Sequence, residues 1–355
     1  MPHYPKYQAV VDYILGKIKN NELASGDRIP SEKELAEIHG VSNITIRKAM
    51  AELVDTGVIY RIKGKGSFVS DGSVHKEEQR HRLVAFLFPG LALSGNAYMQ
   101  YITNMQRYLL NHGYSLIIEN TNADNAGELS VVKKLIEQNV KGFIFFCEDP
   151  EKSIPSFKIL DEKKIPFVLI DRYTTMYPSN YVGSNNHDGA YTAVRHLLNQ
   201  GHINIAYVAN NIHLSSERER YEGYKDALAS AGLTVNPDFL FTTKTSSQEQ
   251  LLGYIKKGMI TAIVTVNDKY AIEVMKYLNQ AGVSIPDDVS LVGFDDADIL
   301  KDAMINLTTV KQFFNEVGYN AAKLLDEIIN HKHHDFNHIR LGIRLIVRES
   351  TKFIQ

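Results

Sequence analysis

Residues 30–49 read PSEKELAEIHGVSNITIRKA and carry the start signals of two short helices in close succession. Ser31 is followed three residues later by Glu34, the spacing of a capping box at the start of a helix. Gly40 is placed to end that helix after only a few turns, and Ser42 is placed to cap the next one. Two helices joined by so short a turn are typical of a helix-turn-helix.

The flanking segments complete a small domain. Apolar residues recur at positions 7, 10, 11, 14, 15 and 18, which form one face of an α-helix. Gly57 is placed to stop the third helix, and two β-prone runs then flank the basic, glycine-rich turn 63–66 as in a hairpin. We therefore expect an α+β winged helix-turn-helix over residues 1–70. Its core should include Leu35, Ala36, Ile38, Ile46, Ala49, Met50 and Leu53.

The second helix of a helix-turn-helix places its N-terminal end against the DNA major groove. Here that end offers hydroxyl, amide and guanidinium groups, which suit phosphate oxygens and base edges; they belong to Ser42, Asn43, Thr45 and Arg47. Residues 42–65 carry five basic and two acidic side chains, a local balance of +3, and the hairpin tip is narrow enough for a minor groove. The sequence thus predicts a DNA-binding surface. The alternative for the domain as a whole is a protein-interaction module. The alternative for the wing lysines is that they lie on a hairpin tip that only water surrounds.

Beyond residue 82, short unbroken apolar runs alternate with helical patterns. Such runs suit strands that are covered on both faces, and they lie at 83–88, 115–118, 142–146, 167–170, 205–208, 262–266 and 289–293. We expect two successive α/β lobes over residues 83–355, each a doubly wound parallel sheet. The segment 71–82 is polar and charged, and it is expected to be a linker.

Polar side chains follow three of these apolar runs. Ligands of doubly wound sheets bind beyond the carboxyl ends of the strands, where this chain places Asp171 and Arg172, Asn267 and Asp268, and Asp295 and Asp296. Carboxylate, amide and guanidinium groups together match a polyhydroxylated ligand, and Tyr98 and Phe294 could cover its apolar face. The alternative for each position is an ordinary helix cap, which weighs most for Asp268 and Asp296.

The N-terminal motifs resemble those of the GntR family of winged-helix regulators. The resemblance rests on residues 30–36, 40–49, 57–59 and 64–69. It implies DNA contacts at Arg28, Lys33, Ser42, Asn43, Thr45, Arg47 and the wing residues Lys63, Gly64, Lys65 and Gly66. Family members often have arginine where this chain has Asn43, so the base preference stays open.

The larger part of the chain resembles the LacI/GalR-type regulatory domain, which has the fold of periplasmic sugar-binding proteins. The resemblance rests on residues 182–190, 196–202, 220–224, 289–296 and 307–312. It implies ligand contacts at Asp171, Arg220, Asn267, Asp295 and Gln312, with Tyr98 and Arg172 as further candidates. The Arg220 guanidinium can bind two adjacent hydroxyls, and its alternative is a surface ion pair within residues 217–220.

The two resemblances together imply a ligand-responsive transcriptional regulator. We expect a homodimeric repressor of sugar-utilisation genes that a small sugar, with arabinose as a candidate, releases from double-stranded operator DNA. LacI-type regulators usually carry their own helix-turn-helix and hinge helix, and this chain has neither. The alternatives are a corepressor-dependent regulator that responds to another sugar or a sugar phosphate, a non-regulatory sugar-binding protein, and an α/β enzyme acting on sugars.

The composition of the chain and the motifs that it lacks exclude several further classes of protein. The net charge of −2 excludes a globally basic nucleic-acid coat, and a single cysteine, Cys147, fits a reducing compartment and a buried apolar role. We find no secretory signal and no membrane-length apolar stretch, so we expect a cytoplasmic protein without a membrane partner. Without a dinucleotide, phosphate-loop or serine-hydrolase motif, we expect neither an enzyme nor a cofactor. The histidines at 331, 333, 334 and 338 are expected to form a solvated turn rather than a metal site.

Overall fold

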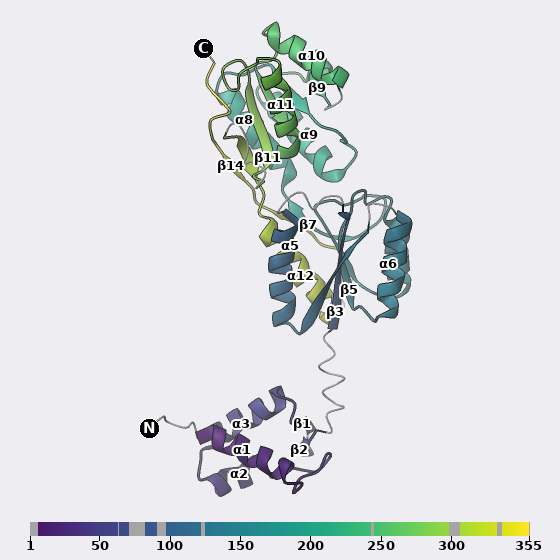
Figure 1. Ribbon diagram of the computed structural model, residues 1–355, viewed down its shortest axis with the longest axis vertical. Coiled ribbons are helices and arrows are strands. Elements are labelled where there is room, and N and C mark those ends of the chain that lie inside the picture. Colours follow the sequence, from purple (N-terminus) through teal and green to yellow (C-terminus); the bar gives the residue numbers. More distant parts are fainter. Residues whose placement is uncertain are drawn as a thin grey trace. The chain divides into compact units, whose positions relative to one another are not determined.

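The computed structural model describes most of the chain, namely residues 6–62, 64–70, 82–90, 97–121, 125–242, 245–297, 306–331 and 336–354. The chain divides into two compact units, Met1–Arg82 and Leu83–Gln355 (Figure 1). Of the predicted linker, residues 71–81 lie outside the described residues.

The N-terminal unit is the expected winged helix-turn-helix. Its elements are α1 (Lys6–Lys19), α2 (Glu32–His39), α3 (Asn43–Asp55), β1 (Ile59–Ile62) and β2 (Gly66–Val69). The two strands pair antiparallel, with Ile59 opposite Val69 and Ile62 opposite Gly66. The hairpin therefore turns at the predicted basic, glycine-rich tip.

Capping groups begin and end these helices as the sequence predicts. The Glu34 backbone N–H donates to Ser31 Oγ at 3.3 Å, and the Ser31 N–H donates to Glu34 Oε2 at 2.7 Å. Gly40 ends α2 with a left-handed φ of 58°, a conformation that glycine adopts without a Cβ penalty. Ser42 Oγ accepts from the Thr45 N–H and begins α3. The turn between α2 and α3 is thus determined locally.

The core of this unit confirms most of the predicted inward residues. Leu35, Ile46, Ala49, Met50 and Leu53 are all buried. The prediction that Ile38 lies in the core is wrong, because this residue is 53% exposed. The ring of His39 instead packs edge-on against Tyr13 of α1, with ring centres 4.8 Å apart, and takes the inner position at the end of the short helix.

The C-terminal unit has two lobes, each built on a twisted sheet. In the first lobe, the described strands follow the order β13-β7-β6-β5-β3-β4. These strands are β3 (Arg82–Phe88), β4 (Tyr114–Asn120), β5 (Gly142–Phe146), β6 (Phe167–Ile170), β7 (Asn180–Ser184) and β13 (His338–Leu341). One face packs on α5 (Ala97–Asn111) and α12 (Phe314–His331), and the other on α6 (Asn125–Glu137) and α7 (Ile154–Glu162) (Figure 1).

The second lobe repeats this plan. Its described strands follow the order β14-β12-β11-β10-β8-β9. They are β8 (Ile205–Val208), β9 (Leu240–Phe241), β10 (Ala262–Thr265), β11 (Ser290–Asp295), β12 (Thr308–Lys311) and β14 (Arg344–Ile346). One face packs on α8 (Asn186–Asn199) and α9 (Ser215–Ser230), and the other on α10 (Thr245–Lys256) and α11 (Asp268–Gln280). A short 3₁₀ helix, η2 (Pro237–Phe239), precedes β9.

The two-lobed α/β architecture with mainly parallel sheets is confirmed, but the expectation that one lobe follows the other along the chain is wrong. The chain passes from the first lobe to the second after β7, returns after β12, and passes over again after β13. β14 also runs antiparallel to β12, so the second sheet is mixed. The returning segments were missed because β12 and β13 are short and carry polar residues. Thr308 and Thr309, for example, are fully buried although they belong to no apolar run.

Helices α8 and α9 approach each other closely at Gly223. A Cβ built on Gly223 would lie 2.1 Å from the His187 carbonyl oxygen and 3.0 Å from the Tyr191 nitrogen. Both are backbone atoms, which cannot move without shifting α8. This contact matters for function because α9 also carries Arg220.

Gly223→Ala should therefore destabilise the second lobe by about 2–3 kcal/mol, because the new methyl group overpacks a backbone contact. Gly253→Ala in α10 is the matched control, since nothing lies within 4 Å of its Cβ position. That variant should be more stable by about 0.5–1 kcal/mol, owing to the lower helix propensity of glycine. Urea unfolding of the full chain measures both. Equal stabilities for the two variants would contradict the close approach.

Candidate functional site

The predicted DNA-binding residues lie at the start of α2, the start of α3 and the wing. Lys33, Ser42, Asn43 and Arg47 are exposed, and Thr45 is half-buried. Ser42 Oγ lies 3.0 Å from Thr45 Oγ1, so these two hydroxyls already hydrogen-bond to each other. Lys65 is exposed on the hairpin, whereas Lys63 lies outside the described residues.

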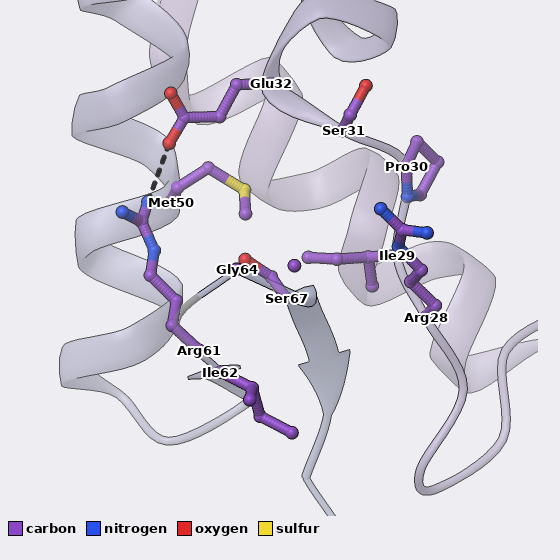
Figure 2. Close-up of a pocket in the computed structure, with 11 residues that line it drawn as sticks. Arg28, Ile29, Pro30, Ser31, Glu32, Met50, Arg61, Ile62, Gly64 and Ser67 are labelled. Carbon is purple, nitrogen blue, oxygen red and sulfur yellow. Dashed lines mark hydrogen bonds and ion pairs between the residues drawn. The ribbon is translucent and has the colours of Figure 1, made fainter.

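A groove of about 540 Å³ separates the start of α2 from the wing (Figure 2). It is lined by Arg28, Ile29, Pro30, Ser31, Glu32, Met50, Arg61, Ile62, Gly64, Gly66 and Ser67. The guanidiniums of Arg28 and Arg61 lie on opposite sides of it (Figure 2). Gly66 has a φ of 115°, and a Cβ there would lie 2.9 Å from Arg28 Nε. Glycine at position 66 therefore leaves space for the Arg28 side chain.

Three further residues lie near the predicted DNA contacts but were not predicted as contacts themselves, namely Glu32, Ile44 and Arg61. Glu32 Oε1 accepts from Arg61 Nη2 at 3.0 Å, and Glu32 Oε2 accepts from Arg47 Nε at 3.4 Å. This carboxylate links the wing to α3 and offsets part of their positive charge. Ile44, at the start of α3, is 80% exposed. Its exposure agrees with the helical spacing, which places Ile46, Ala49, Met50 and Leu53 on the inner face and Ile44 off it.

The predicted effector residues of the C-terminal unit come from both lobes. Asp171 and Arg172 follow β6 in the first lobe, and Asp295 ends β11 in the second. Charges of both lobes act on Asp295: beyond the larger effects of burial and Arg220, Asp171 raises its pKa and Arg172 lowers it. The remaining predicted residues are Tyr98 on α5, Arg220 on α9, Asn267 before α11 and Gln312 after β12.

Arg220 is the most constrained of these side chains. It is only 5% exposed, so the alternative of a surface ion pair is wrong. Nε donates to Asn186 Oδ1 at 2.8 Å, Nη1 donates to the Val266 carbonyl at 2.6 Å, and Nη1 lies 3.6 Å from Asp295 Oδ1. The guanidinium carbon lies 3.8 Å from the centre of the Phe294 ring. Phe294 is 2% exposed, so the expectation that this ring covers a ligand is wrong.

Asp295 is the acidic centre of the site. Gln312 Nε2 donates to Asp295 Oδ1 at 2.6 Å, and the backbone of Asp295 has a φ of 123°, outside the range usual for non-glycine residues. Burial raises the pKa of Asp295 to about 6, although Arg220 and Gln312 oppose the shift. A strained, half-buried carboxyl group held by an amide and a guanidinium is typical of a functional position.

The first lobe contributes a second pair of a carboxylate and a guanidinium, from Asp171 and Arg172, together with aromatic rings. Asp171 has a φ of 65°, and its Oδ2 lies 3.5 Å from Arg172 Nε. Arg172 Nη1 donates to the Glu148 carbonyl at 2.6 Å, and its guanidinium lies over Phe146. Tyr98 packs edge-on against the same ring, with centres 5.1 Å apart. Burial, followed by the charge of Asp171, raises the pKa of Tyr98, so its hydroxyl stays a hydrogen-bond donor.

The polar residues just after β10 and β11 mainly form hydrogen bonds and ion pairs within the second lobe. Asn267 caps α11, because its Oδ1 accepts from the Tyr270 N–H. For Asn267, the bond seen is therefore the one that the alternative of an ordinary helix cap predicts. Asp268 is fully buried and accepts from Thr309 Oγ1 at 2.6 Å and from the Ala297 N–H at 2.9 Å. Asp296 pairs with Arg348 and Lys311. These three residues position the turn that carries Asp295.

The described part of the chain offers neither a metal-binding cluster nor a membrane-spanning helix. Among those residues, no cluster of three or more His, Cys, Asp or Glu side chains is arranged to hold a metal ion. His333 and His334 lie outside that part of the chain. No helix in the described ranges is long and apolar enough to span a bilayer. Cys147 is buried and free, as expected.

The fold and both sites define a transcriptional regulator with a DNA-binding head and a two-lobed ligand-binding body. Residues 6–69 match the family of bacterial regulatory proteins called gntR, and residues 194–351 match the periplasmic binding protein-like domain. The chain thus joins a head that matches the gntR family to a body that matches the periplasmic binding protein-like domain.

Similar proteins are regulators as well. An arabinose metabolism transcriptional repressor of Halalkalibacterium halodurans is 29% identical over 98% of this chain and 96% of that protein. The repressor PurR of Photobacterium profundum is 29% identical over 72% of this chain and 77% of its own length. A LacI-family regulator of Enterococcus faecium, solved with ribose, is 25% identical and covers 77% of this chain and all of that one, with a TM-score of 0.65. These similar proteins are regulators rather than enzymes.

Asp268 provides a test of the buried acidic turn. Burial, followed by the charge of Asp295, raises the pKa of Asp268 to about 8. An unfolded aspartate titrates near pH ~4, so the folded state binds one more proton between that pH and about 8, and stability falls as pH rises through this window. Asp268→Asn removes this titration. Its stability relative to wild type should therefore rise with pH across this window.

Thermal unfolding at several pH values measures this difference. Asp238→Asn is the matched control, because Asp238 is exposed on η2. It should parallel wild type throughout. An Asp268→Asn curve that also runs parallel to wild type would contradict the account of this turn.

Proposed function

We propose that this chain is a homodimeric repressor of sugar-utilisation genes that a small neutral sugar, arabinose or a close analogue, releases from its operator. One observation carries the proposal: a GntR-type head and a periplasmic-binding-protein-like body are joined in one chain. The arabinose metabolism repressor of Halalkalibacterium halodurans matches across nearly the whole of both proteins. Similarity to a second such repressor, from Geobacillus stearothermophilus, supports the same assignment.

The charges of the effector site favour an uncharged ligand over a sugar phosphate. Arg220 faces Asp295, and Arg172 faces Asp171, so each guanidinium already has a carboxylate beside it. A phosphate would have to displace these carboxylates or lie next to them. Hydroxyl groups can instead donate to the carboxylates and accept from the guanidiniums and from the Tyr98 hydroxyl. A polyhydroxylated neutral ligand therefore fits this set of donors and acceptors.

On the DNA side, the start of α3 is proposed to enter the major groove, with Asn43 and Arg47 addressing base edges or phosphates. Ser42, Thr45 and Lys33 would contact phosphates, and the exposed Ile44 would meet a thymine methyl group. Arg28 and the wing residues Gly64, Lys65 and Gly66 would follow the backbone beside the groove of Figure 2. Two heads of a dimer would then read a pseudo-palindrome, and a protein that works on operator DNA acts in the cytoplasm.

Regulation requires the effector to bind one arrangement of the two lobes better than another. A coupling of about 1–3 kcal/mol between effector and operator would change operator affinity by about 5–150-fold. Residues from both lobes face the proposed site, so a bound sugar would hold the lobes in one arrangement. In a dimer this arrangement sets the spacing of the two heads.

Arg47→Ala should weaken binding to a duplex from the protein's own promoter, because one cationic contact is lost. For the same reason, the slope of log affinity against log salt concentration should become shallower by about one. Fluorescence anisotropy at several salt concentrations measures both quantities. Lys17→Ala is the matched control, because Lys17 is a cation of the same head that lies on α1 and pairs with Glu22. Equal affinities and salt slopes for Arg47→Ala and Lys17→Ala would remove Arg47 from the DNA face.

Arg220→Ala should abolish the sugar response while leaving operator binding intact. L-arabinose should raise the melting temperature of the wild type, since a ligand stabilises the state that it binds. The variant should show no such rise. Lys225→Ala, on the same helix, is the control, because Lys225 pairs with Glu222 at the surface. A cooperative unfolding transition of the variant without sugar shows that its second lobe is folded, and a normal sugar response would exclude Arg220 from the site.

A further inference from the structure

A cluster of polar side chains joins the two lobes outside the proposed effector site. Its centre is Glu219 of α9, in the second lobe. Oε1 of Glu219 accepts from the Tyr173 hydroxyl at 2.9 Å and from Arg340 Nη2 at 3.0 Å. Tyr173 follows β6 and Arg340 lies on β13, so both donors belong to the first lobe. Asn186, where the chain enters the second lobe, donates to Oε2 at 3.4 Å.

Tyr173 is held in place from both sides. Its backbone N–H donates to Ser215 Oγ at 2.8 Å, at the start of α9. Its ring packs against Tyr181 and His338 of the first lobe, with ring centres 4.9 Å and 5.0 Å apart, and Arg340 lies over the same ring. The first lobe thus presents Tyr173 and Arg340 as a preformed pair of donors for one carboxylate of the other lobe.

Two features make these bonds important for the arrangement of the lobes. The Glu219 side chain is only 15% exposed, so its bonds to Arg340 and Tyr173 are partly shielded from water. A cavity of about 70 Å³ lies beside them, lined by residues of both lobes, including Thr174 and Asn211. The lobes therefore do not pack densely at this edge, and the polar bonds carry much of the contact there.

The cluster is directly connected to the proposed effector site through α9. Glu219 and Arg220 are consecutive residues of this helix, and consecutive helical side chains point in directions about 100° apart. Glu219 binds the first lobe, while Arg220 reaches Asn186, Val266 and Asp295. Fixing Glu219 therefore fixes the segment of helix from which Arg220 extends.

We propose that Tyr173, Glu219 and Arg340 form an interlobe cluster of positioning residues, which holds the lobes in the effector-binding arrangement and so sets effector affinity without touching the effector. The inference that affinity changes rests on the proposed function, whereas the effect on the lobes does not. Loss of the cluster lowers the populated fraction of the binding arrangement. The apparent dissociation constant rises by the same factor.

The test uses the full chain with one fluorophore on each lobe. Cys147, the single cysteine, is 1% exposed, so labels go to cysteines introduced at the exposed positions Lys163 and Lys257. Labelled chains are mixed with excess unlabelled chains, so that energy transfer occurs within one chain. Transfer is measured without sugar, and L-arabinose affinity is measured by calorimetry.

The variants are Tyr173→Phe, which removes one hydroxyl, and Arg340→Met, which removes the guanidinium but keeps most of the stem. Arg340→Lys restores a cation. Arg344→Met is the matched control, since Arg344 is exposed on β14 and its guanidinium lies over the Phe313 ring. We expect Arg340→Met to shift and broaden the transfer distribution and to weaken L-arabinose binding about tenfold, on the order of one charge-assisted hydrogen bond.

Tyr173→Phe should have the same effect at smaller size, Arg340→Lys should recover most of the affinity, and Arg344→Met should match wild type in both readouts. Melting temperatures without sugar that stay close to wild type separate positioning from general loss of structure. Unchanged transfer and unchanged affinity in Arg340→Met and Tyr173→Phe would overturn the proposal. If transfer changes but L-arabinose binds neither wild type nor variants, the interlobe cluster stands and the proposed effector fails.

Discussion

The buried guanidinium of Arg220 is the interaction on which the effector half of the molecule depends. A charge that is removed from water must be paired and hydrogen-bonded, or it strongly destabilises the fold. Arg220 meets this requirement through Asn186 at the start of α8, the carbonyl of Val266 after β10, and Asp295 at the end of β11. One side chain thus connects three elements at the carboxyl edge of the second sheet. The close contact of α8 and α9 at Gly223 holds the helix that carries it.

The sequence predicted those parts of the fold that are determined locally. The Ser31–Glu34 capping box, the left-handed Gly40 and the Ser42 cap need only a few neighbouring residues, and each lies where the spacing predicts it. The unbroken apolar runs likewise form strands, all of them inside a sheet except 115–118, which lies in the edge strand β4. The passage of the chain between lobes could not be predicted, because β12 and β13 are short strands rich in polar residues. Ile38 was assigned to the core by its spacing, but the ring of His39 occupies that place.

Asp171, Asn267 and Asp295 could be predicted as polar residues at strand ends, and Arg220 only from the resemblance, whereas the partners of these side chains could not be predicted. Arg220 and Asp295 were chosen from the sequence, yet the packing of Phe294 under the guanidinium depends on which way each side chain leaves its element. Contacts between distant positions left no local pattern: Glu32 with Arg61 in the head, and Glu219 with Tyr173 and Arg340 in the body. Such pairs are separated by many residues, and only the tertiary fold brings them together.

The central claim is that one chain couples the occupancy of a sugar site to the affinity of a DNA-binding head. The most direct measurement is a titration of L-arabinose into the full-length protein bound to a fluorescent duplex from its own promoter. The account predicts specific binding without sugar and progressive, saturable release as L-arabinose is added. Failure to retain any promoter duplex, with or without sugar, would contradict it.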